Sequence, residues 1–336
     1  ALMKVAVLGT GGWGLTLGQV LHDNGYNVAF WTHSQEEVEM LTTQHEYKDK
    51  LPGVIFPESF TYSTDMSSVV ADADIILLVV PSQFMLGVAK TLGSCVAKDS
   101  AIVVSATKGI LESTLQRMSE VLLSNVSWLT PEKMVALSGP THAEEVSRRI
   151  YTAIVAACPC EASAKTVQQV FSNSYMRVYT SDDIVGVEIC GSVKNVIAIA
   201  SGVLYGLGAG DNTRAALLTR GQAEMCRLGI ALGANPHTFA GLAGMGDLIV
   251  TCLSEHSRNR YVGEHIGKGE SLEQILKEMK MIAEGVPTCR SAKALAEKSG
   301  VEMPLVNAVY ESLFNGKSAQ DSIRELMGRE LKSEIW

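Results

Sequence analysis

Three patterns that often indicate function are missing from this 336-residue sequence. Its seven cysteines are scattered and odd in number, and Cys158-Pro-Cys160 is C-x-C rather than C-x-x-C. We therefore expect reduced thiols without a disulfide framework, as is usual in the cytoplasm. No set of His and Cys has the spacing of metal ligands, so we predict no metal site. No basic segment followed by an apolar one opens the chain, so we expect no secretory signal.

Positive charge is also scarce, because 28 Lys and Arg stand against 36 Asp and Glu and leave a net charge of −8. This balance argues against general binding to nucleic acid or to anionic membranes. The one long apolar stretch, residues 184–210, holds Glu188, Lys194 and Asn195 and is rich in Gly, Ala and Ser. Such a stretch predicts a buried helix in a soluble core rather than membrane insertion. The positive partners of any anionic ligand must then be gathered locally.

The start of the chain carries the most informative motif. Residues 4–8 are apolar and β-branched, which predicts a strand, and residues 15–22 predict a helix. Between them, Gly9, Gly11 and Gly14 have the G-x-G-x-x-G spacing. The first glycine permits a tight turn, the second lets backbone N–H groups approach a pyrophosphate, and the third lets the helix pack closely on the strand. We predict a dinucleotide-binding turn; a tight turn without a ligand is the alternative.

The order of expected elements indicates the fold class. Strands alternate with helices in the first half, which favours a parallel sheet with crossover helices, whereas strand patterns vanish after about residue 182. We predict an α/β fold: a Rossmann-type doubly wound domain over residues 1–180, followed by an all-α domain over residues 181–336. Residues 44–64 are expected to be irregular. The expected strands are residues 4–8, 27–31, 74–80, 101–105, 134–137, 153–157 and 176–179.

Ligands of open parallel sheets bind beyond the carboxyl ends of the strands. Pro81 follows the strand at 74–80, Lys108 follows the strand at 101–105, and Gly139 and Thr141 follow the strand at 134–137. A cation at the position of Lys108 faces the expected ligand site. The alternative, a lysine in a solvated loop without a ligand, is about equally favoured.

Lys194 is a sharper candidate, because it lies in about two dozen nearly uncharged helical residues. Loss of hydration disfavours the ammonium and can depress a lysine pKa by up to ~3–5 units, into the range useful for proton transfer. The alternative is a lysine whose amine reaches the surface. Neighbouring Asn195 adds a neutral donor and acceptor but indicates nothing alone.

Two polar segments follow in the helical half. Asp247 and Thr251 are four residues apart and share a helix face, so that Asp247 could tune a nearby lysine; a helix-capping carboxylate is the alternative. Ser257, Arg258 and Asn259 precede a predicted helix, where an arginine suits a phosphate. Without further context, an exposed loop with a capping serine is favoured there.

Taken together, these segments closely resemble the NAD(P)-dependent glycerol-3-phosphate dehydrogenases of the bacterial, cytosolic type. The resemblance covers nearly the whole chain, from Gly9 to about Leu326. The matching segments are GTGGWG at Gly9, VVPS at Val79, ATKG at Ala106, SGPTHA at Ser138, GSVKNVIAIASG at Gly191, NTRAALLTRG at Asn212, GLAGMGDLIVTC at Gly241, SRNR at Ser257 and AEG at Ala283.

The resemblance implies reversible hydride transfer between NAD(H) or NADP(H) and dihydroxyacetone phosphate or sn-glycerol 3-phosphate, which supplies phospholipid synthesis. It implies that Lys194 is the general acid/base, and that Lys108, Asn195, Asp247 and Thr251 orient it or the substrate. Analogy of fold implies a homodimer. The residues implied for the substrate are Lys108, Gly139, Thr141, Lys194, Asp247, Ser257, Arg258 and Asn259. Those implied for the cofactor are Gly9, Gly11, Gly12, Trp13, Gly14, His33, Pro81, Lys108, Ala143, Arg258, Ile282 and Glu284.

This sequence departs from the family's pattern in two places. Residues 47–50, Tyr-Lys-Asp-Lys, stand where the family has an Asn-rich segment with an aromatic residue, so no contacts are transferred to that loop. The second strand is followed by Thr32, His33 and Ser34, without the Asp or Glu that favours NAD or the Arg that favours NADP. Since His33 and Ser34 can accommodate a phosphate, we predict use of both cofactors.

Two other functions compete with this one. A related two-domain reductase of another phosphorylated ketose or hydroxy acid would share the fold, but the SRNR segment is of no use to a non-phosphorylated substrate. A non-catalytic dinucleotide sensor would not need Lys194 and Asp247.

Overall fold

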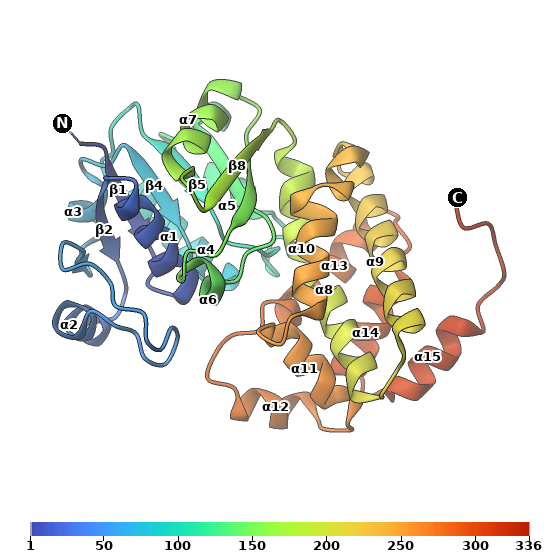
Figure 1. Cartoon of the computed structure of the whole chain (residues 1–336). Helices are drawn as coiled ribbons and strands as arrows, with labels where there is room; N and C mark the ends of the chain where they lie inside the picture. Colours follow the sequence, from blue (N-terminus) through green and yellow to red (C-terminus); the bar gives the residue numbers. More distant parts are fainter. Residues whose placement is uncertain (1, 336) are drawn as a thin grey trace.

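The computed structural model describes residues 2–335 and places an eight-stranded sheet beside a group of helices (Figure 1). The strand order is β3-β2-β1-β4-β5-β6-β7-β8. The strands are β1 Lys4–Leu8, β2 Asn27–Trp31, β3 Thr61–Ser63, β4 Ile75–Leu78, β5 Ile102–Ser105, β6 Met134–Ser138, β7 Thr152–Ala157 and β8 Met176–Ser181. The doubly wound sheet predicted from the sequence is present.

The sheet is buried on both faces because its central strands are apolar throughout. Val5 and Val7 of β1 face the layer that contains α1 and α7, whereas Ala6 and Leu8 face the layer that contains α3, α4 and α5. The helices of this half are α1 Gly12–Asp23, α2 Gln35–Gln44, α3 Met66–Val70, α4 Met85–Gly93, α5 Met118–Asn125, α6 Ala143–Val146 and α7 Glu161–Phe171.

The sheet is parallel, as expected, except at one pairing, where β7 runs antiparallel to β6. A parallel return needs a long crossover, and the segment between these strands holds only the four-residue helix α6. The chain therefore turns back at the carboxyl end of β6. The expectation of irregular chain over residues 44–64 also missed β3, a strand of three residues. Three residues are too few for an alternating pattern to be visible.

The second half is helical, as predicted, and α8 is its central element. Helices α9, α10, α11, α13 and α14 all contact α8. α8 is long and apolar enough to cross a membrane by length and composition, yet 83% of its most apolar window is buried inside the molecule. The helices are α8 Ile184–Gly206, α9 Asp211–Ala231, α10 Asp247–Leu253, α11 Arg258–Gly267, α12 Leu272–Glu278, α13 Gly285–Lys298, α14 Pro304–Phe314 and α15 Ala319–Met327.

Helices α8 and α11 approach closely because glycines line their contact. A Cβ on Gly202 would overlap the carbonyl oxygen of Arg260, and a Cβ on Gly263 would overlap that of Ile199. The first turns of α11 are thereby held against the C-terminal half of α8.

A buried ion pair fixes α8 to the sheet half. Glu188 accepts a hydrogen bond from Arg117 Nη1 at 2.6 Å and one from the backbone N–H of Ser119 at 2.9 Å. Arg117 and Ser119 lie at the start of α5, so the residues that follow Glu188 on α8 are positioned relative to the sheet.

Candidate functional site

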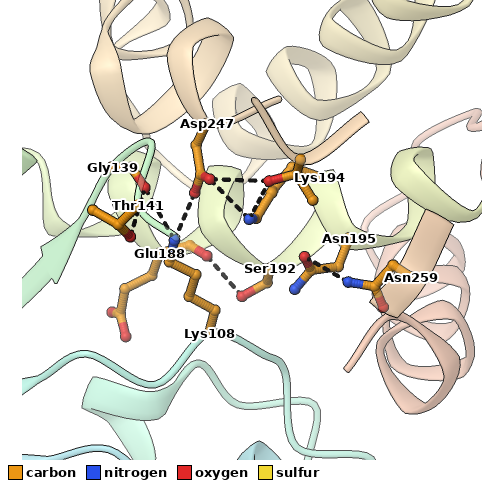
Figure 2. A network of polar contacts seen from close by, with 10 residues as sticks. Lys108, Gly139, Thr141, Glu188, Ser192, Lys194, Asn195, Asp247 and Asn259 are labelled. Atoms are coloured by element: carbon orange, nitrogen blue, oxygen red, sulfur yellow. Dashed lines mark hydrogen bonds and ion pairs between the residues drawn. The ribbon is translucent and has the colours of Figure 1, made fainter. Parts of the chain in front are cut away.

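Lys194 lies at the centre of a buried polar network (Figure 2). It is 6% exposed, and its Nζ donates to Asp247 Oδ1 at 2.8 Å and to Thr251 Oγ1 at 2.7 Å. Asp247 and Thr251 lie one turn apart on α10 and hydrogen-bond to each other at 3.2 Å. A π-helical turn, Leu242–Gly246, precedes α10, and such turns are frequent at functional sites. The amine therefore does not point into solvent but is held in one position by α10.

Lys108 reaches the same carboxylate from the sheet half. Its Nζ donates to Asp247 Oδ2 at 2.8 Å and to the carbonyl oxygen of Gly139 at 3.2 Å. Gly191 of α8 faces this side chain, since a Cβ there would lie 3.4 Å from Lys108 Cγ. Residues that follow the carboxyl ends of β5 and β6 thus lie against α8 and α10. Here the Asp247 carboxylate contacts the ammonium groups of both Lys108 and Lys194.

Burial and charge act on the cluster in opposite directions. Burial lowers the pKa of Lys194 to about 8, the Asp247 carboxylate opposes this shift, and the charge of Lys108 adds to it. Burial alone would raise the pKa of Asp247, but the two ammonium groups outweigh it and the pKa lies below its usual value. Asp247 stays ionised, and the cluster has one net positive charge when both lysines are protonated.

The start of α11 brings two predicted residues into the interior. Asn259 Nδ2 donates to Asn195 Oδ1 at 3.0 Å, and Asn259 Oδ1 accepts from Gly285 N at 2.8 Å. The Ser257 hydroxyl caps α11 by accepting a hydrogen bond from Arg260 N. This contact is the helix capping that the sequence offered as the alternative to phosphate binding. Arg258 is exposed, and its guanidinium has no hydrogen bond or ion pair with the residues described here.

The glycine turn has the geometry that the motif predicts. Gly9 has a φ of +127°, and a Cβ on Gly14 would lie 2.7 Å from the carbonyl oxygen of Gly9. A Cβ on Gly11 would meet nothing within 4 Å, so that side of the turn is open. Gly12 begins α1, and a Cβ there would lie 3.9 Å from Cβ of Ala143. No side chain caps the first turn of α1, which leaves its N–H groups for a ligand.

The remaining predicted positions lie around this turn and the end of β4. Trp13 and Pro81 are half-buried, whereas His33 and Ile282 are exposed. Glu284 accepts from the backbone N–H of Ser82 at 3.1 Å and from its hydroxyl at 2.5 Å, which joins the helical half to the end of β4.

Thr141, another predicted residue, donates to the carbonyl oxygen of Gly139 at 3.3 Å (Figure 2). It therefore lies beside the carbonyl that Lys108 also contacts.

Two residues near the site were not singled out from the sequence. The Glu37 carboxylate accepts hydrogen bonds from Thr10, inside the glycine turn, and from Thr32 Oγ1 at 3.0 Å, at the end of β2. It is five positions beyond Thr32, so a search of the residues directly after the strand overlooks it. His142 has a buried Nε2 without a partner among the described residues, and burial, then the charge of Lys194, lowers its pKa.

Family profiles and curated relatives identify one enzyme family. The profile "NAD-dependent glycerol-3-phosphate dehydrogenase N-terminus" matches residues 4–164, and the corresponding C-terminus profile matches residues 183–324. Glycerol-3-phosphate dehydrogenase (NAD(P)+) of Chlorobium limicola is 47% identical and covers 99% of this chain and 100% of its own length. The enzyme of the same name from Enterococcus faecalis is 44% identical, covering 98% and 97%.

A solved structure shows the same similarity in three dimensions. Glycerol-3-phosphate dehydrogenase of Coxiella burnetii superposes with a TM-score of 0.93 at 34% identity, covering 98% of this chain and 99% of that one. The buried lysine cluster and the open glycine turn therefore lie in a chain that belongs to the family of NAD-dependent glycerol-3-phosphate dehydrogenases.

Proposed function

We propose that this enzyme catalyses reversible hydride transfer between NAD(P)H and dihydroxyacetone phosphate, giving sn-glycerol 3-phosphate, with Lys194 as the general acid/base. The observation that carries the proposal is the fixed amine of Lys194, held by Asp247 and Thr251 where the sheet meets α8. A related reductase of another phosphorylated ketose or hydroxy acid is not favoured, because relatives of this one activity match the full chain.

The glycine turn fits a dinucleotide. The open side of Gly11 and the uncapped first turn of α1 suit a pyrophosphate, and Ala143 lies beside Gly12. The cofactor supplies or accepts the hydride when bound. The remaining residues assigned to it, Trp13, His33, Pro81, Ile282 and Glu284, belong to the same proposal.

Lys194 would manage the proton of the reaction. During reduction, negative charge develops on the substrate's carbonyl oxygen, and a nearby ammonium both stabilises that charge and donates its proton. Asp247 holds the ammonium, and Lys108 adds a second positive charge beside it. A pKa of about 8 leaves both protonation states of Lys194 accessible near neutral pH, which suits a reversible reaction.

Arg258 and the residues around it would hold the substrate phosphate. Arg258 stands at the start of α11, where a helix N-terminus and a guanidinium without a hydrogen bond or ion pair to the described residues both suit an anion. Gly139, Thr141, Asn195, Ser257 and Asn259 are assigned to the substrate side in the same proposal; the amides of Asn195 and Asn259 also bond to each other. Binding energy from the phosphate can then position the reacting carbon.

The broader assignments are proposals of the same kind. We propose two domains, residues 1–180 and 181–336, because β8 ends at Ser181 and α8 begins at Ile184. A cytoplasmic location accords with the seven free cysteines, and the acidic chain accords with no binding to nucleic acid and no membrane insertion. The homodimer, the supply of phospholipid synthesis and the lack of a metal are proposed from the family resemblance. Light scattering coupled to size exclusion tests the dimer.

An absorbance assay of cofactor oxidation with dihydroxyacetone phosphate tests the activity. We expect turnover with both NADH and NADPH, since no carboxylate directly follows Thr32 and His33 is exposed. Strict dependence on NADH would defeat the dual use, and absence of turnover with either cofactor would defeat the function. A non-phosphorylated ketone, dihydroxyacetone, serves as the control substrate and should react poorly.

A further inference from the structure

Lys50 is a half-buried cation that the activity as described above does not use. Its side chain is 27% exposed, and its Nζ lies 3.9 Å from Glu37 Oε1, beyond hydrogen-bond distance. The ammonium donates no hydrogen bond to the residues the structure describes, and it lies 4.4 Å from the centroid of the Tyr47 ring. Partly desolvating an ammonium without an acceptor is costly, and an anionic ligand would remove that cost.

The position of Lys50 places it at the glycine turn. The next residue, Leu51, is 2% exposed and lies 3.6 Å from the position of a Cβ on Gly12, at the start of α1. Glu37, the carboxylate nearest Lys50, hydrogen-bonds to Thr10 within the same turn. Lys50 therefore lies beside the glycine turn, next to a residue that faces Gly12 and near a carboxylate that bonds to Thr10.

The loop that carries Lys50 is well fixed by its own hydrogen bonds. Leu51 N donates to the carbonyl of Tyr47 at 2.8 Å, and Phe56 N donates to that of His45 at 2.7 Å. Tyr47 OH donates to Glu37 Oε1 at 3.1 Å. The lysine is thus presented from an ordered loop rather than from a free surface.

A second cation, Arg258, acts on Lys50 from the helical half. Burial lowers the pKa of Lys50, the Glu37 carboxylate opposes this, and the charge of Arg258 lowers it further. Two cations that repel each other and have no hydrogen-bond acceptor are stabilised by an anion between them.

We propose that Lys50 binds a phosphate group of the dinucleotide, together with Arg258. The assignment rests on the proposed function, since it presupposes a dinucleotide on the glycine turn. It gives a role to a residue in the segment 47–50, where this chain departs from the family's pattern. Two phosphate positions share this chemistry, the diphosphate bridge and the 2′-phosphate of NADPH.

Direct binding of NADH and NADPH to Lys50→Met, followed by nucleotide fluorescence, tests the proposal. Losing one charge-assisted hydrogen bond should raise Kd roughly tenfold. An equal rise for both nucleotides identifies the diphosphate, and a larger rise for NADPH identifies the 2′-phosphate; both support the proposal. An unchanged Kd for both, or an effect confined to the KM for dihydroxyacetone phosphate, overturns it. If the wild-type protein binds neither nucleotide, the proposed function itself fails.

Three further variants separate binding from indirect effects. Lys48→Met removes an exposed lysine two positions away and should leave Kd unchanged. Lys50→Arg keeps the charge and should keep most of the affinity. Removal of Lys50 also leaves Glu37 unscreened, so the double variant Glu37→Gln/Lys50→Met is compared with Glu37→Gln alone. A persistent loss supports direct contact; a loss that disappears means that Lys50 only screened Glu37 and overturns the proposal.

Discussion

The molecule handles positive charge in two contrasting ways. Where the sheet meets α8, Lys108 and Lys194 both donate to Asp247, and each has a second oxygen acceptor. Lys50, beside the glycine turn, has only a long ion pair with Glu37 at 3.9 Å, and Arg258, at the start of α11, has no hydrogen bond or ion pair among the described residues. The first two cations have their hydrogen-bond acceptors within the fold, and the other two do not.

The two arrangements suit two different functions, catalysis and ligand binding. Paired charges in a buried site have fixed positions, so little reorganisation is needed when charge develops during a reaction. Cations without a hydrogen-bond acceptor, near open N–H groups, attract an anion that arrives from outside. We call Lys108, Lys194 and Asp247 the paired group, and Lys50 and Arg258, which lack hydrogen-bond acceptors among the described residues, the unpaired group. We expect changes in the paired group to affect turnover and changes in the unpaired group to affect binding.

Replacement of Lys194 should break the paired group most severely. In Lys194→Ala we expect turnover to fall by about 10³-fold or more, because both the proton donor and the positive charge are lost. The Kd for NADH should stay near normal, since the glycine turn is untouched. Steady-state kinetics and nucleotide fluorescence measure the two quantities.

A matched control is available on the surface. Lys98 pairs with Asp74 at 2.9 Å in a largely exposed ion pair, so Lys98→Ala should leave turnover within about twofold. Turnover of Lys194→Ala close to that of the wild type would refute the role of this amine, and equal loss in both variants would indicate a general structural effect.

Arg258 tests the other side of the comparison. Arg258→Ala should raise the KM for dihydroxyacetone phosphate by about 10- to 100-fold, the value of one or two charge-assisted hydrogen bonds, with a smaller effect on turnover. Arg324, an exposed arginine on α15, provides the control variant Arg324→Ala. An unchanged KM for the substrate in Arg258→Ala would contradict phosphate binding there.

The paired group was only partly predictable from the sequence. The nearly uncharged surroundings of Lys194 predict its burial, and the four-residue spacing predicts that Asp247 and Thr251 share a helix face. The sequence does not show that Lys108 and Lys194 contact the same carboxylate. Asp247 is separated along the chain by 139 positions from Lys108 and by 53 positions from Lys194. Tertiary packing decides such pairings, and local patterns do not contain it.

The unpaired group was harder to foresee. The glycine spacing predicts an anion site, but Lys50 and Glu37 lie in segments whose pattern is that of ordinary surface chain. Their significance depends on the contact of Leu51 with the start of α1 and on the bond from Thr10 to Glu37. The reversal of β7 has the same origin, since it depends on a short connection rather than on the strand's own residues.

The pH dependence of the reaction gives the smallest but most specific test of the paired group. Since burial lowers the pKa of Lys194 to about 8, the amine is mostly protonated below that pH and mostly neutral above it. The kcat/KM for ketone reduction, which uses the ammonium, should be level below about pH 8 and fall above it. The kcat/KM for alcohol oxidation, which uses the neutral amine, should rise through the same range.

Lys108→Met should then move this profile in a known direction. The charge of Lys108 lowers the pKa of Lys194, so its removal should shift both limbs to higher pH, while activity falls by only about tenfold because Lys194 and Asp247 remain paired. An unshifted profile would mean that Lys194 does not titrate in the reaction. A shift to lower pH would mean that Lys108 raises the pKa of Lys194 instead of lowering it. The electrostatic difference drawn between the paired and the unpaired cations would then be wrong.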